Sequence, residues 1–297
     1  MRNFRCATLR FARMVQECRM GITLNVIVSG REIEMQSARL DVTFYTVEES
    51  EEAAVVFHRD GFVCIRDALT QEQLAFAQDG AGRVIAEQRD AFGIEKMNRG
   101  YARHSFGDQL HRAEWAMLVD LPTILPILQA VWKTEDFTCM GAGGDFSLPG
   151  AKIQHLHSDM GDFLLDPQKS VTAFDLPAPF IVVNFPMVDF TRENGAIRFV
   201  PGTQRSRAEI PSLENEPNWM RESILCAPAG SAIVRDVRCW HGGTANQSRQ
   251  PRAMTSVGYY APWYRAREAE ILPGSLYESL SPRAQRLCRH LTGDGAL

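Results

Sequence analysis

The chain has 297 residues, of which 45% are hydrophobic and 23% are charged, which is enough for one large core and too little for two enzyme domains of ordinary size. Its 32 basic and 36 acidic residues give a net charge of -4, with no basic stripe of the kind that follows a nucleic-acid backbone. The seven cysteines have no CxxC spacing, so neither a disulfide framework nor a thiolate zinc site is indicated. No run of about 18 apolar residues is present, which excludes a conventional membrane span.

The N-terminal segment differs in composition from the rest of the chain. Its first 16 residues contain four arginines and no acid, interleaved with apolar residues, as in some organelle-targeting peptides. We favour a different interpretation, in which residues 1–41 are an atypical or disordered extension and residues 42–290 form the catalytic domain. A cytoplasmic protein is expected, and a homodimer is compatible with the sequence.

Helices are predicted mainly in the first half of the chain. A stretch with apolar residues on one helix face ends at Gly61, a residue type common just after a helix end. Thr70 and Gln73 have the spacing of a capping box, which marks the start of a helix. A short strand, Phe62–Ala68, is predicted between these two helices. The three predicted helices are 48–60, about 71–88, and 123–133.

The second half of the chain changes to short runs of β-branched and aromatic residues separated by Gly, Pro, Asn and Asp. About seven short strands of this kind predict a mainly β domain with flanking helices, of the sandwich or jelly-roll type. The predicted strands are 137–148, 152–159, 180–188, 197–203, 220–228, 232–241 and 253–261.

The predicted strand 152–159 carries three potential metal ligands. Side chains alternate along a strand, so His155, His157 and Asp159 share one face. Neighbours on that face are about 6.6 Å apart at roughly 3.3 Å per residue, so two of them can reach one ion, while the outer two are about 13 Å apart. The spacing leaves open which pair binds, and a further ligand must come from elsewhere.

His241 is the best candidate for that further ligand. It ends the strand 232–241 and precedes Gly242 and Gly243, where the backbone can approach a site without side-chain obstruction. Two histidines and one carboxylate on one side of a metal hold iron(II) and leave positions open for other ligands. On its own, however, His241 is better explained as a strand-end histidine that packs against its neighbours.

Arg252 follows His241 by eleven residues and begins the next predicted strand. We expect the two strands to form a hairpin with both residues near its loop. A guanidinium group binds a carboxylate through two parallel hydrogen bonds, which suits the distal carboxylate of 2-oxoglutarate. Arg249 is the competing candidate, but its position inside the loop predicts that it is solvated.

Several motifs in this chain resemble the phytanoyl-CoA dioxygenase family over roughly residues 52–262. The H-x-D pattern is part of a longer one, with Gln154 three residues before His157 and Asp159 two residues after it. The others are Gly-Phe-Val-Cys-Ile-Arg at 61–66, Phe-Thr-Arg-Glu-Asn-Gly-Ala-Ile at 190–197, Pro-Gly-Thr at 201–203, and His241 with Arg252 eleven residues later.

The resemblance implies a double-stranded β-helix, which is a cupin-like jelly roll, and a specific set of site residues. His157, Asp159 and His241 match the family's iron ligands, and Arg252 matches the anchor of 2-oxoglutarate. Gln154 and Asn184 are assigned to cofactor binding, although Asn184 stands where tryptophan is common in the family. Thr203-Gln204 similarly replaces a usual Ser-His pair. Neither change touches the metal, but contacts behind the metal ligands and contacts with the substrate are expected to differ. His155 is left with a supporting role.

The activity implied by the resemblance uses Fe(2+), 2-oxoglutarate and O2. 2-Oxoglutarate is converted to succinate and carbon dioxide while a small organic molecule is hydroxylated, with desaturation or cyclisation as open outcomes. Asp159 fills the position that halogenases give to halide, which disfavours halogenation. We expect a small, partly apolar metabolite, as in secondary metabolism, and we expect segment 164–179 to form a lid or pocket wall. Candidate lining residues are Phe146, Phe163, Trp219, Tyr259, Tyr260 and Trp263.

Two other functions are compatible with parts of the sequence. A zinc hydrolase would use His155, His157 and His241 with one bound water, but it gives Arg252 no role. A non-catalytic jelly roll that only binds a ligand is the second alternative, since a fold does not imply an activity. The complete set of ligands and anchor favours the oxygenase over both.

Overall fold

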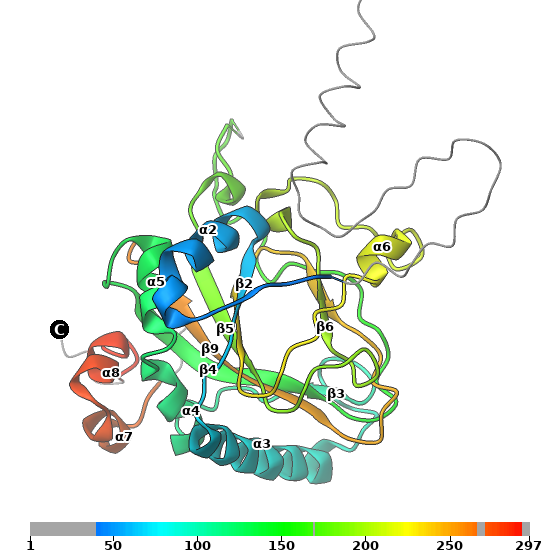
Figure 1. The fold of residues 1–297 in the computed structure, drawn as a ribbon, viewed down its shortest axis with the longest axis horizontal. Helices are drawn as coiled ribbons and strands as arrows, with labels where there is room; N and C mark the ends of the chain where they lie inside the picture. Colours follow the sequence, from blue (N-terminus) through cyan, green and yellow to red (C-terminus); the bar gives the residue numbers. More distant parts are fainter. Residues whose placement is uncertain (1–39, 169, 266–270, 293–297) are drawn as a thin grey trace, which may run out of the picture.

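The computed structural model describes residues 40–168, 170–265 and 271–292. Two sheets form its centre (Figure 1): a seven-stranded sheet in the order β1-β2-β7-β5-β9-β4-β3 and a two-stranded sheet, β6-β8. All neighbours are antiparallel except β1 and β2. The strands are β1 Phe44–Tyr45, β2 Phe62–Ile65, β3 Arg103–Ser105, β4 Thr138–Ser147, β5 Phe180–Pro186, β6 Ile197–Phe199, β7 Ala232–Asp236, β8 His241–Gly243 and β9 Arg252–Tyr260.

The first two predicted helices are confirmed, with the end of α2 and the start of α3 where they were expected, although α3 continues to Phe92. Gly61 closes α2 with a φ of 83°, a left-handed conformation that costs glycine least. Thr70 and Gln73 form the capping box at the start of α3. The helical segments are η1 Val47–Glu49, α2 Ser50–Asp60, α3 Gln71–Phe92, α4 Ala113–Ala116, η2 Met117–Asp120, α5 Leu125–Trp132, η3 Ala173–Asp175, η4 Thr203–Arg205, α6 Asn218–Arg221, α7 Gly274–Ser279 and α8 Pro282–Leu287.

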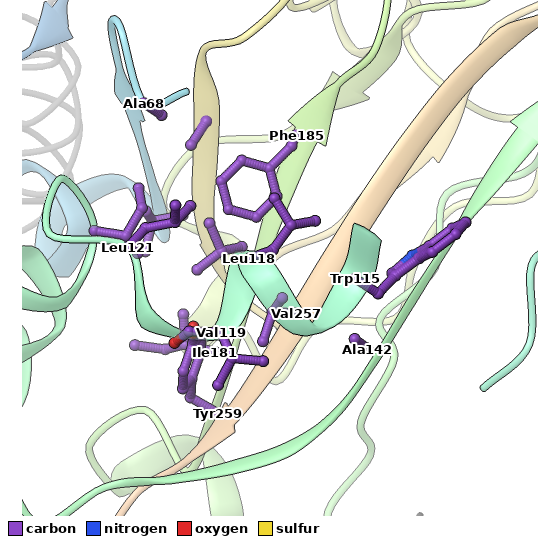
Figure 2. Packing of buried hydrophobic residues seen from close by; sticks show 14 of the residues in the cluster. Ala68, Trp115, Leu118, Val119, Leu121, Ala142, Ile181, Phe185, Val257 and Tyr259 are labelled. Carbon is purple, nitrogen blue, oxygen red and sulfur yellow. The ribbon is translucent and has the colours of Figure 1, made fainter. Parts of the chain in front are cut away.

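The outer face of the large sheet is apolar and is covered by helices. Residues at alternating positions of β5 and β9, such as Phe185 and Val257, belong to the main buried cluster. Trp115 and Leu118, from the α4–η2 segment, lie close to this face (Figure 2). The Trp115 indole is fully buried and donates a 2.7 Å hydrogen bond to the Gly143 carbonyl, so this large side chain leaves no polar group unpaired.

The inner face of the large sheet points toward the small sheet. Phe62 of β2 stacks on Phe199 of β6 with ring centroids 4.7 Å apart, and both belong to a second buried cluster together with Ile233 and Met254. The two sheets therefore enclose an interior, as predicted for a double-stranded β-helix. Because side chains alternate along each strand, the residues two positions from Ile233 and Met254 also face this interior.

Several predicted strands differ from the structure. Segment 152–159 is not a regular strand and joins β8 through a bridge between His157 and His241 and a hydrogen bond from the Gln154 amide to the Gly243 carbonyl. Predicted strand 220–228 begins with α6, and 232–241 is divided by a turn into β7 and β8. The predicted hairpin is wrong, because β8 pairs with β6 whereas β9 pairs with β4 and β5. Hydrophobic runs alone do not show which sheet a strand joins.

Among the described helices, none is by itself long and apolar enough to cross a membrane, although the bent pair Ala113–Asp120 and Leu125–Trp132 meets this test of length and composition when taken together.

Candidate active site

Three of the predicted ligands lie together at the small sheet. His157 and His241 are held side by side because each backbone amide donates to the other residue's carbonyl, at 2.9 and 3.0 Å. Asp159 is fixed by its amide, which donates to the Val237 carbonyl at 2.9 Å. The ligand atoms of the three residues all lie within 4.8 Å of one another, a spacing that fits a metal ion.

Backbone carbonyls orient both imidazole rings. Nδ1 of His157 lies 3.2 Å from the carbonyl of His155, and Nδ1 of His241 lies 2.9 Å from the carbonyl of Cys239. A carbonyl can only accept, so the proton sits on Nδ1 and the lone pair on Nε2 is free. These Nε2 atoms face the Asp159 carboxylate, at 3.7 Å for His157 and 3.6 Å for His241. The rings therefore present the atoms that bind a metal.

The surroundings keep the three groups in the protonation states that metal binding needs. Burial, followed by the nearby Arg235 charge, lowers the pKa of His241 to about 3. Burial likewise lowers the pKa of His157. Although burial opposes the charge on Asp159, the guanidinium of Arg235 holds the pKa of that carboxyl below its usual value. Neutral imidazoles and an ionised carboxylate are the forms that coordinate a metal.

His155 is not part of this group. Its ring centroid lies 5.8 Å from that of His157, but among the described residues only His157, Asp159 and His241 form a cluster of potential metal ligands. The reason is that segment 152–159 is irregular, so the strict alternation expected of a strand does not apply to it. The three-histidine set required by the zinc hydrolase is thus not assembled.

Arg252 is buried at the first position of β9, facing the interior. Its Nε donates to the Gly195 carbonyl at 3.0 Å, its Nη1 donates to Asp145 at 2.7 Å, and its guanidinium lies 5.2 Å from the centre of the Phe190 ring. Its Nη2 is buried and has no hydrogen-bond partner. A buried, unpaired charged donor is costly, so this atom is well suited to a carboxylate ligand. Arg249, in contrast, is exposed, as predicted.

A second arginine, which the sequence did not reveal, lies in the same row. Arg103 of β3 pairs with Ser147 of β4, and Ser147 pairs with Arg252 of β9, so all three side chains share the inner face. Nη1 of Arg103 and Oγ of Ser147 are also buried without a partner. Burial and the neighbouring Arg252 lower the pKa of Arg103 to about 10, which leaves it charged at neutral pH.

The absence of a side chain at Gly243 leaves room for the guanidinium group of Arg103 beside the small sheet. A Cβ atom at Gly243 would lie only 2.3 Å from Nη1 of Arg103, so a side chain at this position would displace the guanidinium. The amide of Gly243 donates to Oε1 of Gln154 at 3.0 Å. Gln154 and Arg103 are therefore both neighbours of Gly243. The predicted contact of Gln154 with a co-substrate stays a prediction.

The positions that depart from the family pattern have structural partners. Oγ1 of Thr203 donates to the Val200 carbonyl and accepts from the Trp240 amide, and Gln204 donates to the carbonyl of His58. Asn184 accepts a 3.0 Å hydrogen bond from Nε of Arg235. Its side chain is thus engaged with a residue that contacts Asp159, and direct contact with a co-substrate stays a prediction.

A groove of about 670 Å³ borders His157. None of the six aromatic residues expected to line the substrate pocket lines this groove. Phe146 and Tyr259, for example, lie on the outer face of the large sheet, in the cluster beneath the helices. The groove is lined by His155, Leu156, His157, Ser158, Met160, Gly161, Phe174, Ser206, Ala208, Ile210, Pro211, Ser212, Leu213 and Trp240.

Sequence comparison assigns this architecture to a family. The sequence model of the family Phytanoyl-CoA dioxygenase (PhyH) matches residues 57–254, more than half of the chain. The chain is 28% identical over 178 residues to dioxygenase af480 of Aspergillus fumigatus, covering 59% of this chain and 54% of that protein. It is 31% identical over 143 residues to the Fe(II)/2-oxoglutarate-dependent dioxygenase nvfF of Aspergillus novofumigatus, covering 47% and 44%. The matched region spans about half the length of these relatives.

Solved structures share the fold at low sequence identity. The epimerase SnoN, in complex with Fe3+, alpha ketoglutarate and nogalamycin RO, has a TM-score of 0.57 and 20% identity, covering 77% of this chain and 91% of SnoN. EctD from S. alaskensis, with 2-oxoglutarate and 5-hydroxyectoine, has a TM-score of 0.55 and 18% identity, covering 76% and 85%.

The low pKa of His241 predicts an acid-sensitive apoprotein. Unfolding restores an ordinary histidine pKa near 6.5, so the unfolded chain takes up the proton first and stability falls as pH decreases below that value. At pH 5, His241 alone should reduce the free energy of unfolding by on the order of 2 kcal/mol relative to pH 7. Urea denaturation of metal-free wild type and His241→Asn at both pH values checks this. An equal loss in both proteins would contradict it.

Proposed function

The chain belongs to the phytanoyl-CoA dioxygenase family, and we propose that it is an iron(II)- and 2-oxoglutarate-dependent dioxygenase that hydroxylates a small, partly apolar metabolite. One observation carries the proposal: the interior between the two sheets contains both the triad His157, Asp159 and His241 and the partnerless donors of Arg252 and Arg103. A site of two histidines and one carboxylate leaves coordination positions open, and two arginines nearby can hold a dicarboxylate.

The triad would hold iron(II) through the Nε2 atoms of the two histidines and one oxygen of Asp159. When bound, iron(II) supplies coordination sites for 2-oxoglutarate and O2 and the oxidising chemistry that couples formation of succinate and carbon dioxide to oxidation of a C–H bond. The protein's own contribution is orientation. The carbonyls of His155 and Cys239 keep each Nδ1 protonated, so the metal-binding atoms need no rearrangement.

The arginine row would bind the carboxylate of 2-oxoglutarate that lies away from the metal. Asp145 already accepts a hydrogen bond from Arg252, so one acid balances one of the two guanidinium charges. A single carboxylate would balance the other, and it would accept from Nη2 of Arg252, Nη1 of Arg103 and Oγ of Ser147, which have no partner. The site therefore fits one carboxylate in both charge and hydrogen bonding.

The groove beside His157 supports a neutral and largely apolar substrate. None of its lining residues is an acid, a lysine or an arginine, and its walls include Phe174, Ile210 and Trp240. Its volume of about 670 Å³ is within the range of pockets that take drug-sized molecules. Secondary metabolism is a fitting setting, and the structural neighbour SnoN comes from nogalamycin biosynthesis.

The insert 164–179 forms part of the wall of this groove through Phe174. Arg207, within the loop 206–213 whose other residues line the groove, forms an ion pair with Asp175 of the insert, and Arg238 donates at 2.6 Å to the carbonyl of Ala173. These contacts support the insert as a pocket wall. They hold it against the loop 206–213 and against the turn that precedes His241.

Anaerobic addition of iron(II) and 2-oxoglutarate should produce the weak visible charge-transfer band of a chelated keto acid. His157→Ala should abolish the band, because it removes a ligand. Arg252→Ala should weaken 2-oxoglutarate binding by about 10- to 100-fold, the effect of losing hydrogen bonds to a charged group. Arg249→Ala is the matched control and should bind normally. A wild type that holds metal but gives no band would favour the zinc or non-catalytic alternatives.

A screen for stimulated succinate formation tests the substrate class. Neutral apolar compounds should raise the rate above that seen with 2-oxoglutarate alone, because the groove offers no charged partner and desolvating a charge without one is costly. Free polar amino acids serve as the comparison set. Stimulation by the amino acids alone would contradict the proposed substrate class without affecting the cofactor assignment.

A further inference from the structure

Arg235 is a charged residue placed inside the barrel. It lies on the inner face of β7, where it pairs with Phe62 of β2 on one side and with Val182 of β5 on the other. Its side chain is only 9% exposed. Burying a guanidinium group is strongly unfavourable before any partner is found, and an apolar residue at such a position is usually more stabilising. The cost suggests a role other than packing.

The partners of Arg235 connect the rigid sheet to the metal ligands. Its Nη1 lies 2.7 Å from Oδ2 of Asp159, and its Nε donates to Oδ1 of Asn184 at 3.0 Å. Asn184 is 2% exposed and lies within β5, between strands β7 and β9. Asp159, by contrast, follows the irregular segment 152–158 and lies outside the strands. Its amide is bonded to the Val237 carbonyl, but that bond fixes the backbone and leaves the carboxylate to be oriented by its side-chain partners.

We propose that Arg235 is a positioning residue for the metal site, which fixes the carboxylate of Asp159 so that one oxygen remains for the metal. Oδ1 lies 3.7 Å from Nε2 of His157 and Oδ2 lies 3.6 Å from Nε2 of His241, so both oxygens border the metal position. Because Oδ2 is the one paired with the guanidinium group, Oδ1 would be the oxygen left for the ion. Asn184 in turn fixes the guanidinium plane. This inference rests on the proposed metal site, but it concerns a residue outside the ligand set.

Positioning and charge have opposite consequences when Arg235 is removed. A cation beside a dication disfavours metal binding by Coulomb repulsion, so loss of the charge alone would make the metal bind more tightly. Loss of positioning would make it bind less tightly, since residues that orient metal ligands typically contribute about 10- to 100-fold in affinity. The sign of the change therefore identifies the role.

The experiment is a titration of the full-length apoprotein with Co(II) alone, followed by the visible absorption of the bound ion. Arg235→Met should raise the Kd for Co(II) roughly 10-fold or more and alter the absorption band, because Asp159 can then offer both oxygens. Arg235→Lys should recover part of the loss, since an ammonium group lacks the planar fork that reaches two partners. Asn184→Ala should cause a smaller loss in the same direction.

Arg112→Met is the control for the loss of an ion-paired arginine, because Arg112 pairs with Glu87 of α3 rather than with a metal ligand. It should leave the Kd for Co(II) unchanged, and circular dichroism establishes that each variant is folded. If Arg235→Met binds Co(II) as tightly as wild type or more tightly, with the same spectrum, the positioning role is wrong. Failure of wild type itself to bind Co(II) would instead refute the proposed metal site.

Discussion

Pairing of charges inside the barrel is the constraint on which the rest of the structure depends. The interior is lined by apolar residues such as Phe62, Phe199 and Met254, and a charge placed there without a partner would be strongly destabilising. Its charged groups accordingly form two sets. Asp159 pairs with Arg235, while Asp145 pairs with Arg252 beside Arg103.

The metal ligands and the arginines lie on different sheets and meet only when the barrel closes. The metal ligands belong to β8 and the segment alongside it, whereas the arginines belong to β3, β7 and β9 of the large sheet. The helices stabilise this arrangement from outside, because α3, α5 and the α4–η2 segment bury apolar residues in the outer cluster. The site is thereby held rigidly before any ligand arrives, which reduces the cost of binding.

The sequence predicted those parts of the site that depend on local pattern. The capping box at Thr70, the helix end at Gly61 and the spacing of His157 and Asp159 can each be read within a few residues. Arg252 was found through its distance from His241. Arg103 and Arg235 were missed because their roles depend on strand register, which no short motif records. The same reason explains the misplaced Phe146, since alternation on β4 directs it outward while Asp145 and Ser147 point inward.

Thermodynamic coupling between metal and co-substrate tests the account most directly, because a dication and a dianion held in one interior must influence each other's affinity reciprocally. The measurement is the Kd of 2-oxoglutarate by calorimetry under nitrogen, with and without saturating Co(II), and the Kd of Co(II) with and without 2-oxoglutarate. The account predicts that each ligand tightens the other by the same factor, of about 10-fold or more. Identical 2-oxoglutarate affinities with and without metal would contradict the claim that the triad and the arginine row form a single site.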